Sequence, residues 1–383
     1  MLTHHRPRSP GRLQRAIYQL RTEGSGSRAR EAWTIGLGLF IGCSPLIGFH
    51  LGIALLVGWL FGLNRVKLYL AANLMNPVIL PGIFFAEVQA GALLRQGHFY
   101  PITLDTFYTL EFWHFGLDLL IGSLIVGTAI GAFGGLMTFM AVGRSLRDPA
   151  FTELVKESSD RYLASGVTAW EFARGKLRND PAYRQVVTGG LLPTRGQLLD
   201  VGCGQGLLLA LIAAARRAGR AGTWPAEWAA APTELELTGV ELRPRIARIA
   251  ADALGADAAI HQADARSLQP ATADIITLFD LLHLMSAGEQ ERLLSTLTTA
   301  LTPGGALLIR EADAAGGWRF HMVRFGNRLT AMFTRRWGTR FHFRTAADWH
   351  ALLERLGLQV QEVRPAGDGT PFANVLLVAR RGA

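Results

Sequence analysis

The chain of 383 residues has only two cysteines, Cys43 and Cys203. Two thiols are too few for a disulfide framework or for a zinc site built on several cysteines, so we expect no metal site, and a reducing compartment fits. Charged residues are also scarce, at 18% against 49% hydrophobic residues. This balance argues against a disordered chain and against one that is soluble throughout, and it predicts that part of the chain lies in lipid.

The basic residues form no single stripe along the chain. The net charge is +9, and the first 30 residues carry seven arginines against one acidic residue, Glu23. A nucleic-acid binder needs a basic face with interleaved aromatics, whereas a basic head before apolar segments is typical of a signal for membrane topology. We therefore expect no nucleic-acid partner and interpret residues 1–31 as a basic head in the cytoplasm.

Three runs lack formal charge: Ala32–Asn64, Leu68–Ala86 and Leu119–Val142. A helix needs roughly 20 apolar residues to cross the hydrocarbon layer, and the third run predicts a single span. The first run is too long for one crossing and is broken at Ser44-Pro45, which predicts two short helices or one span with a kinked extension.

The second run contains Asn73, Asn76-Pro77 and Pro81, which favour a broken or re-entrant segment. Glycine pairs four residues apart, which let helix backbones approach closely, recur in this half at Gly38/Gly42, Gly48/Gly52, Gly58/Gly62 and Gly127/Gly131/Gly135. Residues 32–145 are therefore predicted to be a helical membrane domain.

Basic residues flank this predicted domain on both sides, which places both flanks in the cytoplasm. Two cytoplasmic flanks require an even number of crossings, so we expect a multi-pass protein of the inner membrane. Polar residues inside the domain favour either a transport path or interhelical hydrogen bonds. These residues are His50, Asn73, Asn76, His98, His114 and Asp118. The segments LGLFIGCSPLIGFH and NRVKLYLAANLMNPVILP resemble a prokaryotic membrane domain of unknown function that is found alone or fused to enzymes, and the resemblance implies no chemistry.

The second half contains a glycine-rich turn between a strand and a helix. Residues 146–195 read as a helical cap or linker, and GQLLDVGCGQG then follows as a strand from Leu198 to Val201 with Gly202, Gly204 and Gly206 after it. Glycines permit the sharp turn and let a ligand approach the backbone at a helix N-terminus. This order is typical of a nucleotide-type pocket.

Acidic residues follow at the predicted ends of later strands. We expect a second strand ending at Glu241, a third ending at Asp264 and a fourth ending at Asp280, with His283 just beyond. LTPGGALLIRE predicts a turn and a fifth strand, and LQVQEV and FANVLLVAR predict two late strands. Strands alternating with helices imply a mostly parallel, seven-stranded α/β Rossmann-like sheet with ligands at the carboxyl ends.

The run from Leu198 to Arg380, with LLDVGCGQG and LTPGG, resembles the class I S-adenosylmethionine-dependent methyltransferases. The resemblance implies a methyltransferase domain over residues 196–383 and S-adenosylmethionine as cofactor. It also implies a role for each matching residue. The methionine end of the cofactor would be contacted by Asp200, Gly202, Gly204 and Gly206, and the ribose by Glu241. The adenine would be contacted by Asp264 and Ala265, and the rim of the cofactor by Phe279 and Asp280. A dinucleotide fingerprint would need glycine at position 207, where the chain has Leu207.

His283 is the candidate general base because imidazole suits proton removal from a phenol, hydroxy acid or activated carbon acid. The segment LLHL resembles the LHH segment of ubiquinone-type and small-molecule methyltransferases, although the second histidine is replaced by Leu284. A strand-end histidine that only bonds to the backbone is the alternative. His321 and His342 are further candidates for the base.

Two segments depart from a minimal domain. Residues 216–234 are an insertion that predicts an exposed loop, with Trp224 and Trp228 either packing on the fold or touching the membrane interface. Trp318–Arg344 interleaves seven aromatic residues with seven arginines, typical of an amphipathic helix on anionic headgroups, of a lid over an apolar acceptor pocket, or of an ordinary capping helix.

These patterns favour a membrane-anchored enzyme that moves a methyl group from S-adenosylmethionine to an oxygen, or less readily a carbon, of an apolar or membrane-associated small molecule. A membrane transport or scaffold protein whose cytoplasmic domain senses S-adenosylmethionine is the alternative. The sequence leaves the acceptor and the oligomeric state open.

Overall fold

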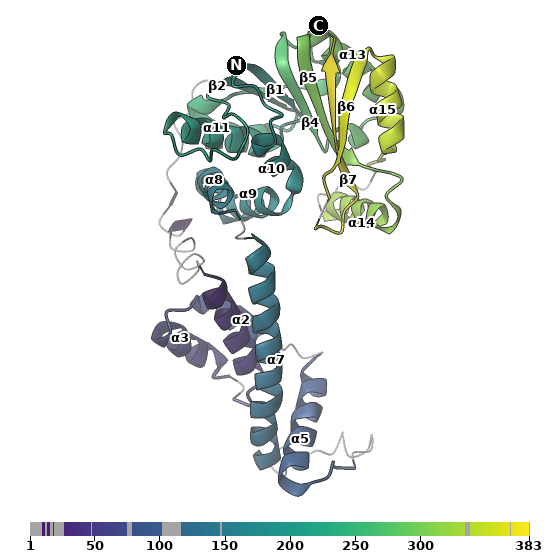
Figure 1. Ribbon diagram of the computed structural model, residues 1–383. Coiled ribbons are helices and arrows are strands. Elements are labelled where there is room, and N and C mark those ends of the chain that lie inside the picture. Colours follow the sequence, from purple (N-terminus) through teal and green to yellow (C-terminus); the bar gives the residue numbers. More distant parts are fainter. Residues whose placement is uncertain are drawn as a thin grey trace. The chain divides into compact units, whose positions relative to one another are not determined.

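The computed structural model describes residues 10–11, 14–15, 18, 27–46, 48–74, 79–101, 116–145, 148–333, 338–367 and 369–382. The chain divides into two compact units, one formed by Arg12–Asp148 and one that contains Pro149–Ala383. Figure 1 labels most of the elements of both. Several residues with predicted roles lie outside the described ranges: most of the basic head, Asn76, Pro77, His114, Arg335, Arg336 and Trp337.

The first unit is helical. Its described helices are α2 (Arg28–Gly42), α3 (His50–Leu60), α4 (Arg65–Ala72), α5 (Leu80–Gln96) and α7 (Gly116–Ser145). Side-chain oxygens cap two of them, because Ser27 accepts a hydrogen bond from the Arg30 amide and Asn64 accepts one from the Lys67 amide. The chain leaves helical geometry between α2 and α3, where the sequence has Ser44-Pro45, so the first apolar run forms two short helices.

One helix among the described residues, α7, is long and apolar enough to cross a membrane, over Gly116–Met140. The helix α3 is apolar but has only 11 residues, too few for a straight crossing. The predicted even number of crossings is therefore not supported by the helices that the structure describes.

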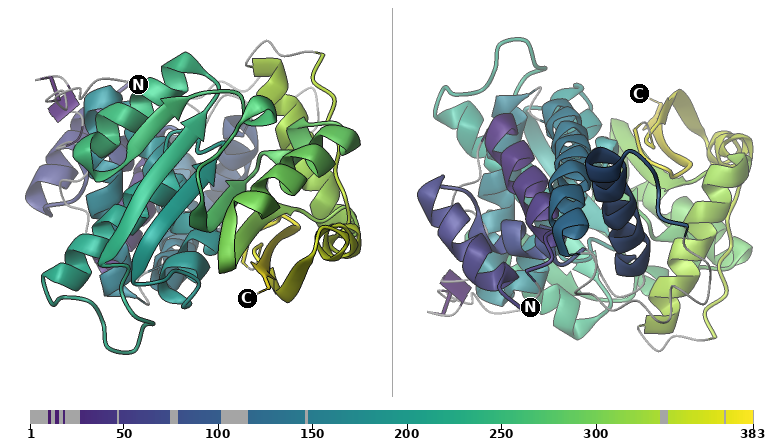
Figure 2. Two further views of the ribbon diagram at one scale, coloured as in Figure 1. Left: turned by 90° about the horizontal axis from the view of Figure 1, so that it is seen from above. Right: turned by 90° about the horizontal axis from the view of Figure 1, so that it is seen from below.

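Glycines bring three helices of this unit into backbone contact. A Cβ atom built on Gly36 would lie 2.8 Å from the Gly131 carbonyl oxygen, and one built on Gly122 would lie 1.6 Å from the Glu87 carbonyl oxygen. The helices α2 and α5 accordingly lie on either side of α7 (Figure 2, right). The expected contacts at Gly48 and Gly52 are wrong, since a Cβ there would meet nothing within 4 Å.

Polar side chains in this unit bond to one another. The buried Asp118 carboxylate accepts hydrogen bonds from Arg95 Nε at 2.5 Å, Arg95 Nη2 at 2.8 Å and the Tyr100 hydroxyl at 2.7 Å. His50 Nε2 lies 3.2 Å from the Ser44 carbonyl oxygen. These contacts favour the structural interpretation of both residues over a transport path.

The second unit is built on a seven-stranded sheet in the order β3-β2-β1-β4-β5-β7-β6. The strands are β1 (Arg195–Val201), β2 (Glu234–Glu241), β3 (Ala259–Gln262), β4 (Ala273–Phe279), β5 (Leu301–Ala312), β6 (Leu358–Pro365) and β7 (Asn374–Arg381). Strands β1 to β5 pair in parallel, while β7 runs antiparallel to both β5 and β6. The predicted Rossmann-like, mostly parallel sheet is confirmed, and the carboxyl ends of β1 to β5 share one edge.

Four helices that pack on strands of this sheet are α11 (Leu207–Arg220), α12 (Pro244–Leu254), α13 (Ala287–Ala300) and α15 (Ala346–Arg355). The helix α14 (Gly317–Phe333) follows β5 in the chain. Residues 207–215 of α11 are all buried, which makes it a core helix. The predicted loop begins only after α11 ends at Arg220, and Trp224 and Trp228 pack edge to face on each other with ring centroids 4.8 Å apart.

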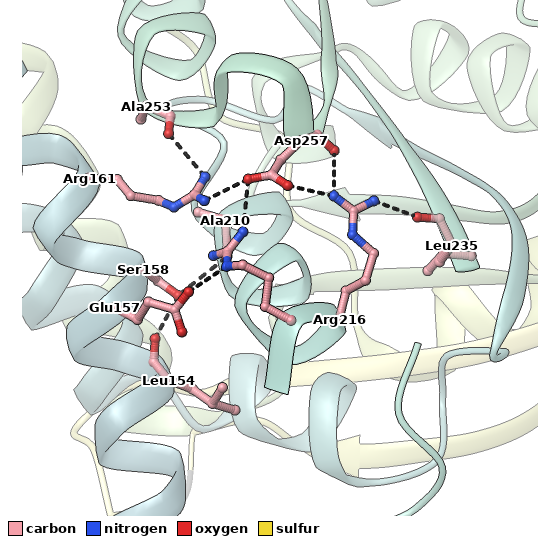
Figure 3. Close-up of polar contacts among 10 residues, drawn as sticks. Leu154, Glu157, Ser158, Arg161, Ala210, Arg216, Leu235, Ala253 and Asp257 are labelled. Carbon is pink, nitrogen blue, oxygen red and sulfur yellow. Dashed lines mark hydrogen bonds and ion pairs between the residues drawn. The ribbon is translucent and has the colours of Figure 1, made fainter. Parts of the chain in front are cut away.

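Three helices before β1, α8 (Pro149–Asp160), α9 (Val167–Asn179) and α10 (Pro181–Thr188), pack against α11 and form a cap together with a 3-10 turn at Arg161–Ser165. Asp257 is the anchor of this cap, because its carboxylate accepts hydrogen bonds from Arg161 at 2.6 Å, Arg216 at 2.7 Å and Arg217 at 2.8 Å. Arg217 also bonds to Glu157 of α8 at 2.5 Å. Figure 3 shows Arg161 and Arg216 pointing toward Asp257. The cap is therefore tied to the sheet layer by charge-assisted bonds.

Candidate active site

The glycine-rich turn joins β1 to α11 through three left-handed residues. The φ angles of Gly202, Gly204 and Gly206 are 74°, 58° and 74°, a conformation that favours glycine. A Cβ on Gly202 would lie 2.8 Å from the Leu281 side chain, and one on Gly206 would lie 2.8 Å from Leu254. Gly204 is different, because a Cβ there would project into open space. The backbone is thus approachable at Gly204.

Neighbouring elements hold this turn in place. The Gly202 and Cys203 amides donate to the Val240 carbonyl oxygen at 2.8 and 3.0 Å. From the cap, the buried Tyr162 hydroxyl donates to the Gln205 carbonyl oxygen at 2.9 Å. Burial raises the pKa of Tyr162, so the hydroxyl stays a donor. No sequence pattern pointed to Tyr162, which lies 43 residues from its partner.

Glu241 is the last residue of β2, as the sequence predicted, and its side chain reaches the glycine-rich turn. Its Oε2 accepts from the Gly204 amide at 3.0 Å, and its Oε1 accepts from the Arg243 amide at 3.0 Å and from Arg243 Nε at 2.7 Å. The carboxylate is buried, so its charge is compensated by these donors. The sequence reasoning missed Arg243, two residues further along the chain.

Asp200 lies one residue before the end of β1 and is buried. Its Oδ1 accepts a hydrogen bond from Thr277 Oγ1 on the adjacent strand β4 at 2.7 Å. Burial raises the pKa of the Asp200 carboxyl to about 7, the negative charge of Glu241 adds to this, and the bond from Thr277 opposes it. Asp200 therefore titrates near neutral pH in this structure.

The predicted end of the third strand is wrong by two residues, because β3 stops at Gln262 and Asp264 begins a 3-10 turn that contains the buried Ala265. The Asp264 side chain caps this turn by accepting from the Arg266 amide at 3.0 Å, a local bond that competes with the strand. Hydrogen bonds from Arg266 and its charge lower the pKa of Asp264. Asp264 still lies at the same edge of the sheet as Glu241.

The fourth strand ends at Phe279, whose ring packs edge to face on Tyr183 of the cap with centroids 5.8 Å apart. Asp280 follows with φ 56°, the only positive φ outside glycine among the described residues. Its carboxylate bonds to Arg310 of β5 and to Lys176 of α9, the latter at 3.2 Å. Burial alone would raise the pKa of Asp280, but the charges of Arg310 and Lys176 hold it below its usual range.

Arg310 is buried and bonds to two carboxylates. One is Asp280, and the other is Asp180, which accepts from Arg310 Nη2 at 2.6 Å. Lys176 Nζ lies 2.8 Å from the same Asp180 carboxylate. The cap thus closes over the ends of β4 and β5 through two acidic and two basic groups, and Asp280 serves this ion-pair network. None of the cap members was predicted from the sequence.

His283 follows β4 in a short 3-10 turn and is 7% exposed. Its Nδ1 lies 2.8 Å from Oε2 of Glu311, and Oε1 of Glu311 accepts from the Leu282 amide at 2.6 Å. Glu311 is only 1% exposed. Burial alone would lower the pKa of His283, but the charge and hydrogen bond of Glu311, with the charge of Asp280, raise it above 6.5.

Aromatic rings surround this pair. The Phe343 ring stacks on the His283 imidazole at 5.2 Å between centroids and 10° between planes, and Phe341 lies 5.9 Å away. The His342 amide donates to the His283 carbonyl oxygen at 2.8 Å. The side chains of the other two candidate bases, His321 and His342, are exposed. Of the three histidines, only His283 has both a buried carboxylate partner and an aromatic enclosure.

A family model described as a methyltransferase domain matches residues 170–363, just over half of the chain. A second model, described as an uncharacterized protein conserved in bacteria (DUF2062), matches residues 12–148. No curated protein matches the chain.

Similar solved structures include magnesium protoporphyrin IX methyltransferase from Synechocystis with bound S-adenosylhomocysteine, with 17% identity, coverage of 63% of this chain and 99% of that one, and a TM-score of 0.40. A methyltransferase from Methanosarcina mazei has 19% identity, coverage of 50% and 94%, and a TM-score of 0.37. A TehB-like methyltransferase from Corynebacterium glutamicum has 17% identity, coverage of 58% and 97%, and a TM-score of 0.37. The assignment therefore depends on the family model.

The residues at the carboxyl edge of the sheet fit the cofactor that the sequence implied. The turn is open at Gly204, a buried carboxylate follows β2 at Glu241, and a second carboxylate follows β3 at Asp264. A backbone open to close approach and strand-end carboxylates are what a nucleoside with a charged tail requires. The chain belongs to the methyltransferase-domain family, and its cofactor is S-adenosylmethionine.

Proposed function

We propose that this protein transfers a methyl group from S-adenosylmethionine to an oxygen, or less readily a carbon, of an apolar or membrane-associated small molecule, with His283 as the general base. The observation that carries the proposal is the buried hydrogen bond between His283 Nδ1 and Glu311 Oε2 at 2.8 Å. The pair lies beyond the carboxyl end of β4 and near the end of β5, the edge where ligands bind in sheets of this kind.

The cofactor supplies a methyl group on a sulfonium. Glu311 accepts a hydrogen bond from the N–H at His283 Nδ1, which leaves Nε2 unprotonated. Nε2 can then take the proton of the acceptor hydroxyl as its oxygen bonds to the methyl carbon and the bond from that carbon to the sulfonium sulfur breaks. The imidazolium that forms is stabilised by the Glu311 carboxylate. Phe341 and Phe343 shield the imidazole from water and provide an apolar wall for the acceptor.

Cofactor binding is assigned to residues around the glycine-rich turn. Glu241 accepts from the ribose hydroxyls, Asp264 with Ala265 contacts the adenine, and the methionine end lies along Gly202–Gly206 near Asp200. Phe279 and Asp280 form the rim. Support comes from the approach to the backbone at Gly204 and from the buried position of Glu241 beside it.

Anchoring to the cytoplasmic membrane belongs to the same proposal. Its support is α7, which has the length and composition of a membrane span over Gly116–Met140. A location on the cytoplasmic side keeps the methyltransferase domain with its cofactor, and the basic residues of the N-terminal head favour that side.

Formation of S-adenosylhomocysteine by the full-length protein, supplied with an extract of membrane lipids, tests this proposal. His283→Ala should lower turnover by roughly 10²-fold or more with cofactor affinity nearly unchanged, because the base acts only in the chemical step. His321→Ala is the matched control, since that side chain is exposed. Cofactor binding without turnover in the unmodified protein would contradict the enzyme and support the sensing alternative.

A further inference from the structure

An apolar stripe runs along the outer face of α14. Its members are Trp318, Met322, Phe325, Leu329 and Met332, spaced by four, three, four and three residues. This spacing puts them on one face of the helix. All five are exposed, with Trp318 at 66% and Phe325 at 64%. Apolar side chains that are exposed and contiguous mark an interaction surface.

The opposite face of α14 is attached to the domain. The Phe320 ring packs edge to face on Phe343 with centroids 5.1 Å apart. Arg319 Nη2 donates to the Gly367 carbonyl oxygen and, at 3.0 Å, to the Thr370 carbonyl oxygen. The stripe is therefore presented by a helix with a defined orientation. Phe343 in turn stacks on His283, so the attached face of α14 lies two aromatic contacts from the proposed base.

The positive charge beside this stripe indicates which kind of surface would cover it. Arg324 and Arg328 are exposed and lie along one flank of it. From Asp313 to Asp348 the sequence has seven arginines and no acidic residue between them. An apolar surface next to such a basic segment complements a surface that is apolar inside and negatively charged outside.

We propose that the stripe of α14 docks on an anionic phospholipid surface, with Trp318 and Phe325 inserted between headgroups and with Arg324 and Arg328 on the phosphates. Arginine stems can lie along the interface while their guanidinium groups stay with the headgroups. Docking would hold the aromatic enclosure of His283 beside the bilayer in which an apolar acceptor dissolves. The docking itself does not depend on methyl transfer, and only its link to the acceptor relies on the proposed function.

The test uses the full-length chain in two kinds of vesicle, pure phosphatidylcholine and equal parts of phosphatidylcholine and phosphatidylglycerol, both with brominated acyl chains. The fluorescence of Trp318 is obtained as the difference between the unmodified protein and Trp318→Phe. We expect bromine to quench this emission in the anionic vesicles and much less in the neutral ones. Salt should weaken the quenching, since it screens the headgroup charge.

Arg324→Gln combined with Arg328→Gln should lower the ratio of docked to undocked helix roughly tenfold or more in the anionic vesicles. The matched control is Arg292→Gln with Arg355→Gln, which removes the same charge from exposed positions on α13 and α15 and should leave quenching unchanged. Equal quenching in both vesicles, or no response to the Arg324 and Arg328 changes, overturns the proposal.

Hydrogen exchange of the α14 amides in the unmodified chain gives the same comparison without a substitution. Slower exchange in anionic than in neutral vesicles supports docking on lipid. Equal protection in detergent and in both vesicles means that another part of the chain or a second copy covers the stripe, and the lipid proposal fails. Because neither measurement involves turnover, an inactive protein that still docks would refute the proposed function alone.

Discussion

The two parts of the candidate site differ in how their carboxylates are held. At the ends of β2 and β3, the proposed cofactor edge, Glu241 and Asp264 each bond to an arginine two residues along the chain, and Glu241 also accepts from the Gly204 amide. At the ends of β4 and β5, the proposed acceptor edge, Glu311 bonds to His283, which is 28 residues away, and Glu311 is more deeply buried than Glu241. The first arrangement suits a carboxylate that exchanges partners when a ligand binds, and the second suits one that keeps an imidazole fixed.

If this distinction is right, changes at the acceptor edge act on turnover and changes at the cofactor edge act on affinity. Glu311→Gln should lower kcat by about 10²-fold, because a neutral amide holds the imidazole without stabilising its charged form. The Glu311 carboxylate raises the pKa of His283, so its loss should also move the acidic limb of the kcat profile to lower pH. The measurement is steady-state kinetics against pH. An acidic limb that stays at the same pH would show that Glu311 does not act on the pKa of the base.

The free energy of unfolding, measured against pH, tests the buried environment of Asp200 at the cofactor edge. Its pKa is raised from 3.8 to about 7, so from about pH 4 to pH 7 the unfolded chain has released a proton that the folded chain keeps. Stability should therefore fall as the pH rises through this window and stay at the lower level above it. Asp200→Asn cannot ionise and should be more stable than the unmodified protein above pH 7, by on the order of 4 kcal/mol.

Urea unfolding of the Pro149–Ala383 unit, followed by tryptophan emission at pH 4 and pH 8, measures this difference. The two proteins should nearly coincide at pH 4, which serves as the internal control. A gap of the same size at both pH values would show that Asp200 acts through packing alone.

Glu241→Ala should weaken S-adenosylmethionine binding by about 30-fold, since the ribose loses a charged acceptor. The value of kcat at saturating cofactor should change little. Calorimetric titration measures the affinity, and Glu236→Ala is the matched control because Glu236 is exposed on the same strand. A larger effect on kcat than on affinity would remove the distinction between the two edges.

The smallest effect is expected at Tyr162, which touches the glycine-rich turn only through the Gln205 carbonyl oxygen. Tyr162→Phe removes one hydrogen bond, worth about 1 kcal/mol, and should weaken cofactor binding about fivefold with kcat preserved. Calorimetric titration of Tyr162→Phe and Glu241→Ala under the same conditions gives the ratio of their dissociation constants for S-adenosylmethionine. No loss of affinity would mean that the turn keeps its shape without the cap.

The cofactor edge was the more predictable part because its signals are local. Gly202, Gly204 and Gly206 stand within five residues, and a left-handed backbone at each is a property of glycine itself. Glu241 ends a strand whose alternation is visible in the sequence, and parallel pairing brings such ends together. Asp264 shows the limit of this reasoning, because its own side chain ends the strand region earlier than the apolar pattern indicated.

The helical unit shows the same limit. Glycine spacing predicted close contacts at Gly38 and Gly42, which the structure has, and at Gly48 and Gly52, which it does not have. Spacing says only that small residues share one face of a helix, and the neighbour that occupies the face is chosen by packing. Gly91 and Gly122, where an added Cβ would collide with a carbonyl oxygen of the neighbouring helix, do not belong to any predicted pair.

Local patterns were enough to predict the Rossmann-like sheet, the glycine-rich turn and the cofactor, because periodicity and glycine conformation act over a few residues. Long-range packing was needed to show that Glu311 supports His283 and that the apolar stripe of α14 is exposed. It also brings Tyr162, Lys176 and Asp180 of the cap to the carboxyl edge. Each of these depends on residues far apart in the chain that meet only when helices pack on the sheet, and no local pattern encodes such distances.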